Sequence, residues 1–95
     1  MNMSHMELTD SEDKRMVESR QQLLNAMLLS LGSYIEQESK KKDQWRDKTY
    51  GETYAHLKHE IAEIARSKEK TVQLHNAMDA CVLSAILVCK LMPKF

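Results

Sequence analysis

The sequence predicts an all-α protein, because its composition and its apolar periodicity both favour helices. The 95-residue chain contains two glycines, one proline and only 5% aromatic residues, whereas Leu, Ala, Met, Glu, Lys and Gln are abundant. Such a chain is poor in turn and strand formers and rich in helix formers. A chain this short buries only roughly 60 to 65% of its extendable surface. We therefore expect one domain over residues 9–95, with three helices and a core that a second copy completes as a bundle of four or more helices.

Charge and cysteine content indicate which partners and which compartment to expect for this chain. Lys plus Arg and Asp plus Glu balance at 14 each, so the net charge gives no reason to expect a nucleic acid or an acidic membrane as partner. Cys81 and Cys89 lie too far apart on one helix to bridge each other, and two buried reduced thiols favour the cytoplasm. The apolar run 80–89 is too short to span a bilayer, which indicates a core helix. Residues 1–8 lack the features of a signal peptide and are expected to be a disordered tail or an expression remnant.

The first helix is expected over residues 10–42. Thr9 can cap its start, because a Thr hydroxyl accepts a hydrogen bond from the backbone of the first turn. Leu24, Met27 and Leu31 then recur at helical spacing, which is typical of a helix packed in a bundle. The composition turns polar after this apolar stripe, and the polar segment is the predicted connector.

Two shorter helices are expected over residues 53–66 and 71–92. Thr53 is the predicted cap of the earlier one, whose apolar stripe passes through Ile61. The later helix should end before Pro93, because a proline disfavours helical backbone at the residue that precedes it. Short links between the helices make them neighbours in space.

Two pairs of oxygen-bearing side chains carry the main functional hypothesis. One pair lies on each of the two shorter helices, and its members are one helical turn apart. Asp79 stands among apolar residues, where a carboxylate costs free energy to bury unless a cation or hydrogen-bond donors compensate it. Two such pairs on facing helices can surround Mg²⁺ or Mn²⁺, which can then bind a polyphosphate. The predicted metal ligands are Glu60, Glu63, Asn76 and Asp79.

The same residues also have structural explanations, and spacing does not choose between the two. Glu60 and Glu63 are compatible with a solvated helix flank on which Glu63 pairs with Arg66. Asn76 and Asp79 have the spacing of a helix-capping box.

Trp45 and the basic residues around it form a second candidate site. Lysines in the segment 40–48 can contact phosphates while the indole of Trp45 stacks on a base. Asp43 and Asp47 are interleaved with these basic side chains, which argues against a nucleic-acid surface but leaves room for one small nucleotide. The alternative is a solvated helix end with one half-buried Trp. Histidine spacing favours no zinc site, and no nucleophile motif or glycine-rich phosphate loop is present in the sequence.

Residues 45–88, about half of the chain, resemble the MazG-like branch of the all-α nucleoside triphosphate pyrophosphohydrolases. The similarity lies in segments 45–51, 56–64 and 76–79. The family pattern has two adjacent glutamates and a third glutamate one turn later, then, after a gap, a glutamate and an aspartate one turn apart. The resemblance implies a three-helix MazG-like protomer and an Mg²⁺-dependent hydrolase that releases pyrophosphate and a nucleoside monophosphate.

Carried over by position, Glu60, Glu63 and Asp79 are the acids that would bind the metal and support catalysis. His59 stands in place of the first of the adjacent glutamates, and Asn76 stands in place of the glutamate that precedes the aspartate. Both departures remove negative charge, so the affinity for Mg²⁺ should be lower than the family pattern implies.

The resemblance also suggests contacts to the substrate and leaves two competing functions open. Trp45 would contact the base, and Lys48 or Lys58 would contact the phosphates. The first competitor is a MazG-like module that binds nucleotide without turning it over. The second is a structural helical protein, such as a small phage or bacterial accessory factor, that docks on a protein partner through its apolar face.

Overall fold

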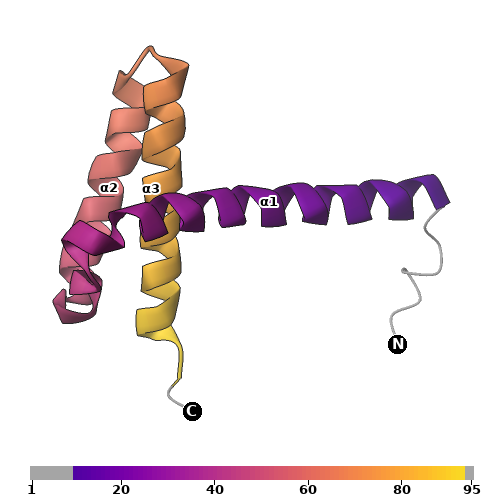
Figure 1. Cartoon of the computed structure of the whole chain (residues 1–95). Helices are drawn as coiled ribbons and strands as arrows, with labels where there is room; N and C mark the ends of the chain where they lie inside the picture. Colours follow the sequence, from indigo (N-terminus) through magenta and orange to yellow (C-terminus); the bar gives the residue numbers. More distant parts are fainter. Residues whose placement is uncertain (1–9, 94–95) are drawn as a thin grey trace.

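The computed structural model describes residues 10–93 and contains three α-helices and one short 3₁₀ helix (Figure 1). Their bounds are α1 Asp10–Lys41, η2 Gln44–Asp47, α2 Tyr50–Arg66 and α3 Lys70–Leu91. No strand occurs within these described residues, which confirms the all-α prediction. Helices α2 and α3 form a hairpin, and α1 crosses it at a steep angle and projects well beyond it (Figure 1). The predicted tail and the predicted cap Thr9 lie outside the described residues.

Helix α2 begins one turn earlier than the sequence predicts. Its cap is Thr49, whose hydroxyl accepts a hydrogen bond from the backbone N–H of Glu52, 3.1 Å away. The Glu52 carboxylate in turn accepts the backbone N–H of Thr49 at 2.9 Å, which completes a capping box. The prediction that Thr53 is the cap is therefore wrong: this residue lies inside the helix and is buried. An acid three positions after the cap is the distinguishing signal, and Thr49 has one whereas Thr53 does not.

Helix α3 follows α2 after a three-residue link. The side-chain amide of Gln73 donates to the carbonyls of Ile64 (3.1 Å) and Ser67 (2.9 Å), so it ties the start of α3 to the end of α2. Asn76 and Asp79 lie in the interior of α3, and the cap residue of this helix is Glu69. Their interpretation as a capping box is therefore wrong, and their side chains need another explanation.

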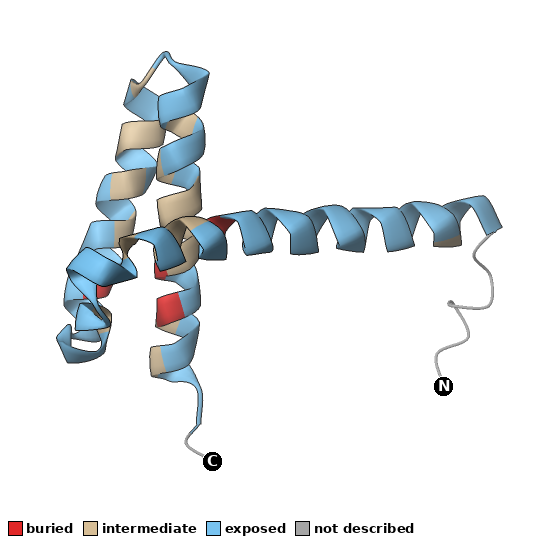
Figure 2. Cartoon of the chain, in the orientation of Figure 1, coloured by how far each residue is buried: buried red, intermediate tan, exposed pale blue. Residues whose placement is uncertain are grey.

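The core lies where α1, α2 and α3 meet. Leu83 (9% exposed) and Ile86 (7%) are the buried apolar side chains of the described chain, and both belong to α3 (Figure 2). Ser30 of α1 and Thr53 of α2 are buried beside them as small polar residues. The Ser30 hydroxyl donates to the Ala26 carbonyl at 2.9 Å, so its burial leaves no unsatisfied donor.

Much of the predicted apolar packing is not made within one protomer. Leu24, Met27 and Leu31 are each about half exposed, as is Ile61 on α2. Figure 2 shows the projecting part of α1 almost entirely exposed. The prediction that both thiols are buried is also wrong, since Cys81 is half-buried and Cys89 is exposed, although both are free as expected.

Two further features of the fold are the end of α1 and the apolar composition of α3. Helix α1 ends at Lys41, and the next residue, Lys42, has a φ of 54°, which lies in the left-handed region that stops a helix. Helix α3 is long and apolar enough to cross a membrane by length and composition alone, although the sequence predicts a run too short to do so. Core helices of soluble proteins pass the same test, but they are mostly buried, whereas 6% of this apolar window is buried here. In this structure α3 is the helix against which both α1 and α2 pack.

Candidate functional site

A cleft of about 520 Å³ opens where the end of α1 and the connector meet the α2–α3 hairpin. Its floor is apolar and comes from α3, and its walls carry aromatic, basic and acidic side chains from every element of the fold. Four of the residues predicted from the sequence line it together, namely Trp45, Lys48, Glu60 and Asp79. The remaining lining residues are Tyr34, Gln37, Lys41, Lys42, Gln44, Glu52, Thr53, His56, Val82, Leu83 and Ile86.

Trp45 is held on one side of the cleft by contacts to two other helices. Its indole Nε1–H donates to the Tyr34 hydroxyl at 3.0 Å, which joins η2 to α1. The Lys90 ammonium lies 5.9 Å from the centre of the Trp45 ring and also donates to the Lys48 carbonyl at 2.6 Å. Because these contacts come from opposite ends of the sequence, the ring position is fixed by the tertiary fold. A half-buried aromatic ring fixed in this way can stack on a base.

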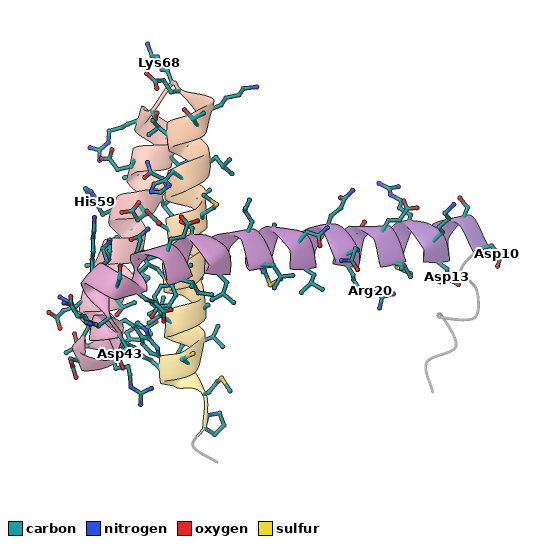
Figure 3. All side chains as sticks on the ribbon, viewed as in Figure 1. Asp10, Asp13, Arg20, Asp43, His59 and Lys68 are labelled. Carbon is teal, nitrogen blue, oxygen red and sulfur yellow. The ribbon has the colours of Figure 1, made fainter. Side chains whose placement is uncertain are left out.

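Basic side chains lie on the same side of the cleft as Trp45. Lys41 and Lys42 come from the end of α1, and Lys48 comes from the segment between η2 and α2. Figure 3 labels Asp43, the acid that follows these α1 lysines, at this end of the hairpin, and Lys68 at the opposite end. Three lysines at one cleft supply donors for an anionic group such as a polyphosphate.

Two acids from different helices complete the cleft. The Glu60 side chain is 13% exposed, and its Oε1 atom lies 3.4 Å from His56 Nε2. The Asp79 side chain is 34% exposed, and its Oδ2 atom lies 3.9 Å from His75 Nε2. Each carboxylate therefore has a histidine one turn earlier on its own helix, and it is otherwise open toward the cleft that both acids line. Of the four predicted metal ligands, Glu60 and Asp79 are therefore the two that line this cleft.

Three other predicted site residues do not line the cleft. Glu63 pairs with Arg66, as its structural explanation predicts, and it lies 4.0 Å from His59. The ammonium of Lys58 lies 5.6 Å from the centre of the Tyr54 ring. Asn76 is half-buried on the inward face of α3, one turn before Asp79. The structure therefore divides the predicted site into a part that shares one cleft and a part that does not.

The acids of the cleft suit a metal that arrives with its substrate better than an all-protein metal cage. Among residues 10–93, no group of three or more His, Cys, Asp or Glu side chains is close enough together to hold a metal ion. Mg²⁺ is usually bound by one or two carboxylates together with substrate phosphates. Glu60 and Asp79 supply this smaller donor set, and their oxygens are of the type that Mg²⁺ prefers.

Glu52 is a third acid on the cleft wall, but the capping box engages it. The backbone N–H of Thr49 lowers the pKa of Glu52 most strongly, and the Thr49 hydroxyl lowers it further. Desolvation opposes these effects, while Lys48 and Lys90 add a smaller lowering of the pKa. Glu52 is therefore a structural carboxylate that remains ionised to lower pH than an unperturbed glutamate.

Several residues of the cleft were not identified from the sequence. Tyr34 and Lys90 contact the Trp45 region from distant parts of the chain, and no local signal predicts such contacts. The sequence does contain a signal for two histidines of the site. His56 and His75 each precede a site acid by four positions, which is the spacing of neighbours on one helix face. Comparisons of the chain with models of protein families, with curated proteins and with solved structures found no match.

Proposed function

We propose that this cleft binds a nucleoside triphosphate together with Mg²⁺, and that the chain is a MazG-like nucleotide-binding protein. The observation that carries the proposal is that one cleft is lined by Trp45, by three lysines and by the carboxylates of Glu60 and Asp79. An aromatic ring suits a base, ammonium groups suit phosphates, and carboxylates suit the metal that accompanies a triphosphate.

Glu60 and Asp79 are the residues that would hold Mg²⁺, with Mn²⁺ as a substitute. A bound divalent ion supplies charge neutralisation and Lewis-acid polarisation of a phosphoryl group. The chain itself contributes the lysines that orient the phosphates. Val82 and Ile86 of α3 form the apolar floor of the cleft, which excludes water on that side of a bound ligand.

Hydrolysis to pyrophosphate and a nucleoside monophosphate is the second candidate function, and the two carboxylates at the proposed metal position favour it. Restoring the acid that the family pattern has at position 76 tests it. If the chain is a pyrophosphohydrolase of this type, Asn76→Glu adds a carboxylate one turn before Asp79, and pyrophosphate release with Mg²⁺ should rise above a detectable native rate. Glu60→Gln or Asp79→Asn should then abolish that rate, because both acids line the cleft. Absence of pyrophosphate release from native protein and Asn76→Glu alike rejects hydrolysis and leaves the binding proposal standing.

Calorimetric titration with a panel of nucleoside triphosphates, with and without Mg²⁺, tests binding. Native protein should bind at least one of them in an Mg²⁺-dependent manner, and Glu60→Gln or Asp79→Asn should weaken binding about tenfold or more, which is roughly 1.4 kcal/mol. Glu18→Gln is the matched control, because Glu18 is an exposed acid on α1 that does not line the cleft. Glu63→Gln decides whether the metal site extends beyond the cleft. Equal binding by native, Glu60→Gln and Asp79→Asn proteins rejects the site.

Mg²⁺ alone provides a second readout of the same acids. If Glu60 and Asp79 bind the metal in the absence of nucleotide, millimolar Mg²⁺ or Mn²⁺ should raise the melting temperature by mass action. Asp79→Asn should remove this rise. A native melting curve that does not change with Mg²⁺ contradicts metal binding by the apo protein.

The proposal includes a cytoplasmic homodimer, which supplies the core that one protomer lacks. A helical interaction protein with no nucleotide ligand is the competing function, and the exposed apolar residues of α1 favour it. The titration separates the two, because only the proposed function predicts saturable nucleotide binding.

A further inference from the structure

The heptad pattern of α1 has no partner within the protomer. Val17, Leu24 and Leu31 recur at seven-residue intervals, and Leu28 and Ile35 each follow four positions later, as the two apolar positions of a coiled coil do. We call these five residues the α1 seam. All five are between 48% and 57% exposed. A row of large apolar side chains that is half exposed along a helix marks a surface that another element covers.

The α1 seam is separate from the face by which α1 packs on the hairpin. Ser30 is the buried residue of α1, and it lies roughly 130° around the helix from the middle of the seam. Tyr34 and Gln37, which are half-buried, lie on the same side of α1 as Ser30. The hairpin therefore leaves all five seam residues about half exposed, although Leu28 borders the groove between α1 and α3. Figure 3 shows the free part of α1, labelled by Asp10, Asp13 and Arg20, extending away from α2 and α3.

The exposed area of the chain matches what a stable dimer needs. The chain exposes 8069 Å², whereas a compact monomer of this mass exposes roughly 5,600 Å². The excess is about 2,450 Å² per copy, and about 1,000 Å² remain for residues 10–93 when the other eleven residues are counted at the surface of an extended chain. Two copies that remove this excess bury roughly 2,000 to 4,900 Å² in total, which is the range of obligate homodimers.

The charges at the ends of α1 define the direction in which two copies pair. The first turn carries Asp10 and Asp13, and the last turn carries Lys40 and Lys41. In an antiparallel pair of α1 helices, the acidic end of one copy lies beside the basic end of the other, and the helix dipoles are also opposed. A parallel pair places like charges together at both ends.

We propose that two copies of this chain dimerise through the α1 seam, with their α1 helices antiparallel. The two-fold axis passes between Leu24 and Leu28, so that Leu24 of one copy packs against Leu28 of the other and Val17 packs against Ile35. Each projecting half of α1 then lies along the packed half of the other α1, beside the groove of about 410 Å³ that α1 forms with α3. This inference deepens the homodimer part of the proposed function and does not depend on nucleotide binding.

Sedimentation of native and substituted chains tests the surface. Native protein should sediment as a dimer at low micromolar concentration, and Leu24→Lys or Leu28→Lys should shift the equilibrium to monomer by at least tenfold in dissociation constant. Val88→Lys is the matched control, since Val88 is as exposed as Leu28 but lies on α3. A native monomer, or a dimer that Val88→Lys dissociates while both seam variants leave it intact, overturns the proposal. Calorimetric titration of the same samples with nucleotide keeps this outcome distinct from failure of the cleft.

Cysteine cross-linking tests the direction and does not require a variant that disrupts the dimer. Leu24→Cys and Leu28→Cys are made separately in a chain whose native cysteines are replaced by Ser. After mild oxidation, an equimolar refolded mixture of the two variants should give a covalent dimer that neither variant gives alone. Cross-linking of each variant with itself, at a rate equal to or above that of the mixture, indicates a parallel pair and overturns the antiparallel arrangement.

Discussion

The α2–α3 hairpin and the projecting half of α1 both carry large apolar side chains, but the two apolar side chains that are buried among the described residues both belong to the hairpin. Leu83 and Ile86 of α3 are covered by neighbouring helices, whereas Leu24 and Leu28 of α1 remain half exposed. The difference lies in what each segment packs against. The short link after α2 places α3 directly beside it, whereas the connector after α1 directs that helix across the hairpin (Figure 1).

The two regions also differ in where they place charge. Around the hairpin, acids and bases converge on the cleft, where Glu60, Asp79 and Lys48 share one cavity. In α1, the first turn is acidic and the last turn is basic. Convergent charge suits a compact ligand with phosphates and a metal, whereas helix ends of opposite charge suit a second helix of opposite direction.

The largest expected effect comes from truncating the same residue type in the two regions. Leu83→Ala removes one of the buried apolar side chains of the core, so the free energy of unfolding should fall by about 2 to 4 kcal/mol. Leu23→Ala, at a 61% exposed position of α1 outside the seam, should cost less than about 1 kcal/mol. Chemical denaturation of both variants checks this contrast. Equal losses of stability contradict the view that α3 carries the core.

A smaller effect is expected at the capping box that begins α2. Thr49→Ala removes the hydroxyl that accepts the Glu52 N–H, so stability should fall by about 1 kcal/mol. Because the folded state lowers the pKa of Glu52, its carboxylate contributes stability that is present above the unfolded pKa and is lost as the pH falls through the lower folded pKa.

Glu52→Gln checks the pH dependence of this cap. Glutamine keeps the capping geometry but does not titrate, so stability measured across the acidic range should lose the component that depends on Glu52. If the free energy of unfolding of Glu52→Gln falls at acidic pH as it does in native protein, the pH-dependent stability does not come from the capping box.

The smallest expected effect is a gain in stability on α1. Gly32 lies inside this helix, and a Cβ built there meets no atom within 4 Å. Gly32→Ala should therefore raise the free energy of unfolding by roughly 0.5 to 1 kcal/mol, since alanine loses less backbone entropy in a helix. Thermal melting at fixed protein concentration measures the change. A loss of stability indicates that another chain approaches Gly32 closely in the assembled protein.

Local sequence signals predict the helices well and the tertiary contacts of the cleft poorly. The bounds of α1 and α3 lie within one residue of those expected, because apolar periodicity and Pro93 are local signals. The contact between Trp45 and Tyr34 joins two elements whose crossing angle no local pattern encodes. The hydroxyl of Thr53 alone suggests a cap, but the acid that completes a capping box is Glu52, three positions after Thr49.

The predicted site shows the same division between local and tertiary information. The spacing of Glu60 and Glu63 predicts both as metal ligands. In the structure Glu60 lines the cleft, whereas Glu63 pairs with Arg66 on the exposed side. The rotation of α2 against α3 decides between them, and that rotation depends on packing over the whole hairpin. The apolar neighbours of Asp79 are local in sequence and single out this carboxylate, which the structure places on the cleft wall.

Fluorescence of Trp45 tests the central claim most directly, because this residue is the single tryptophan of the chain and lies on the cleft wall. Titration with an Mg²⁺–nucleoside triphosphate should change its emission in a saturable manner, and the Asp79→Asn variant should require about tenfold more ligand for the same change. Emission that stays constant up to millimolar ligand, or a response identical in native and Asp79→Asn proteins, contradicts nucleotide binding in this cleft.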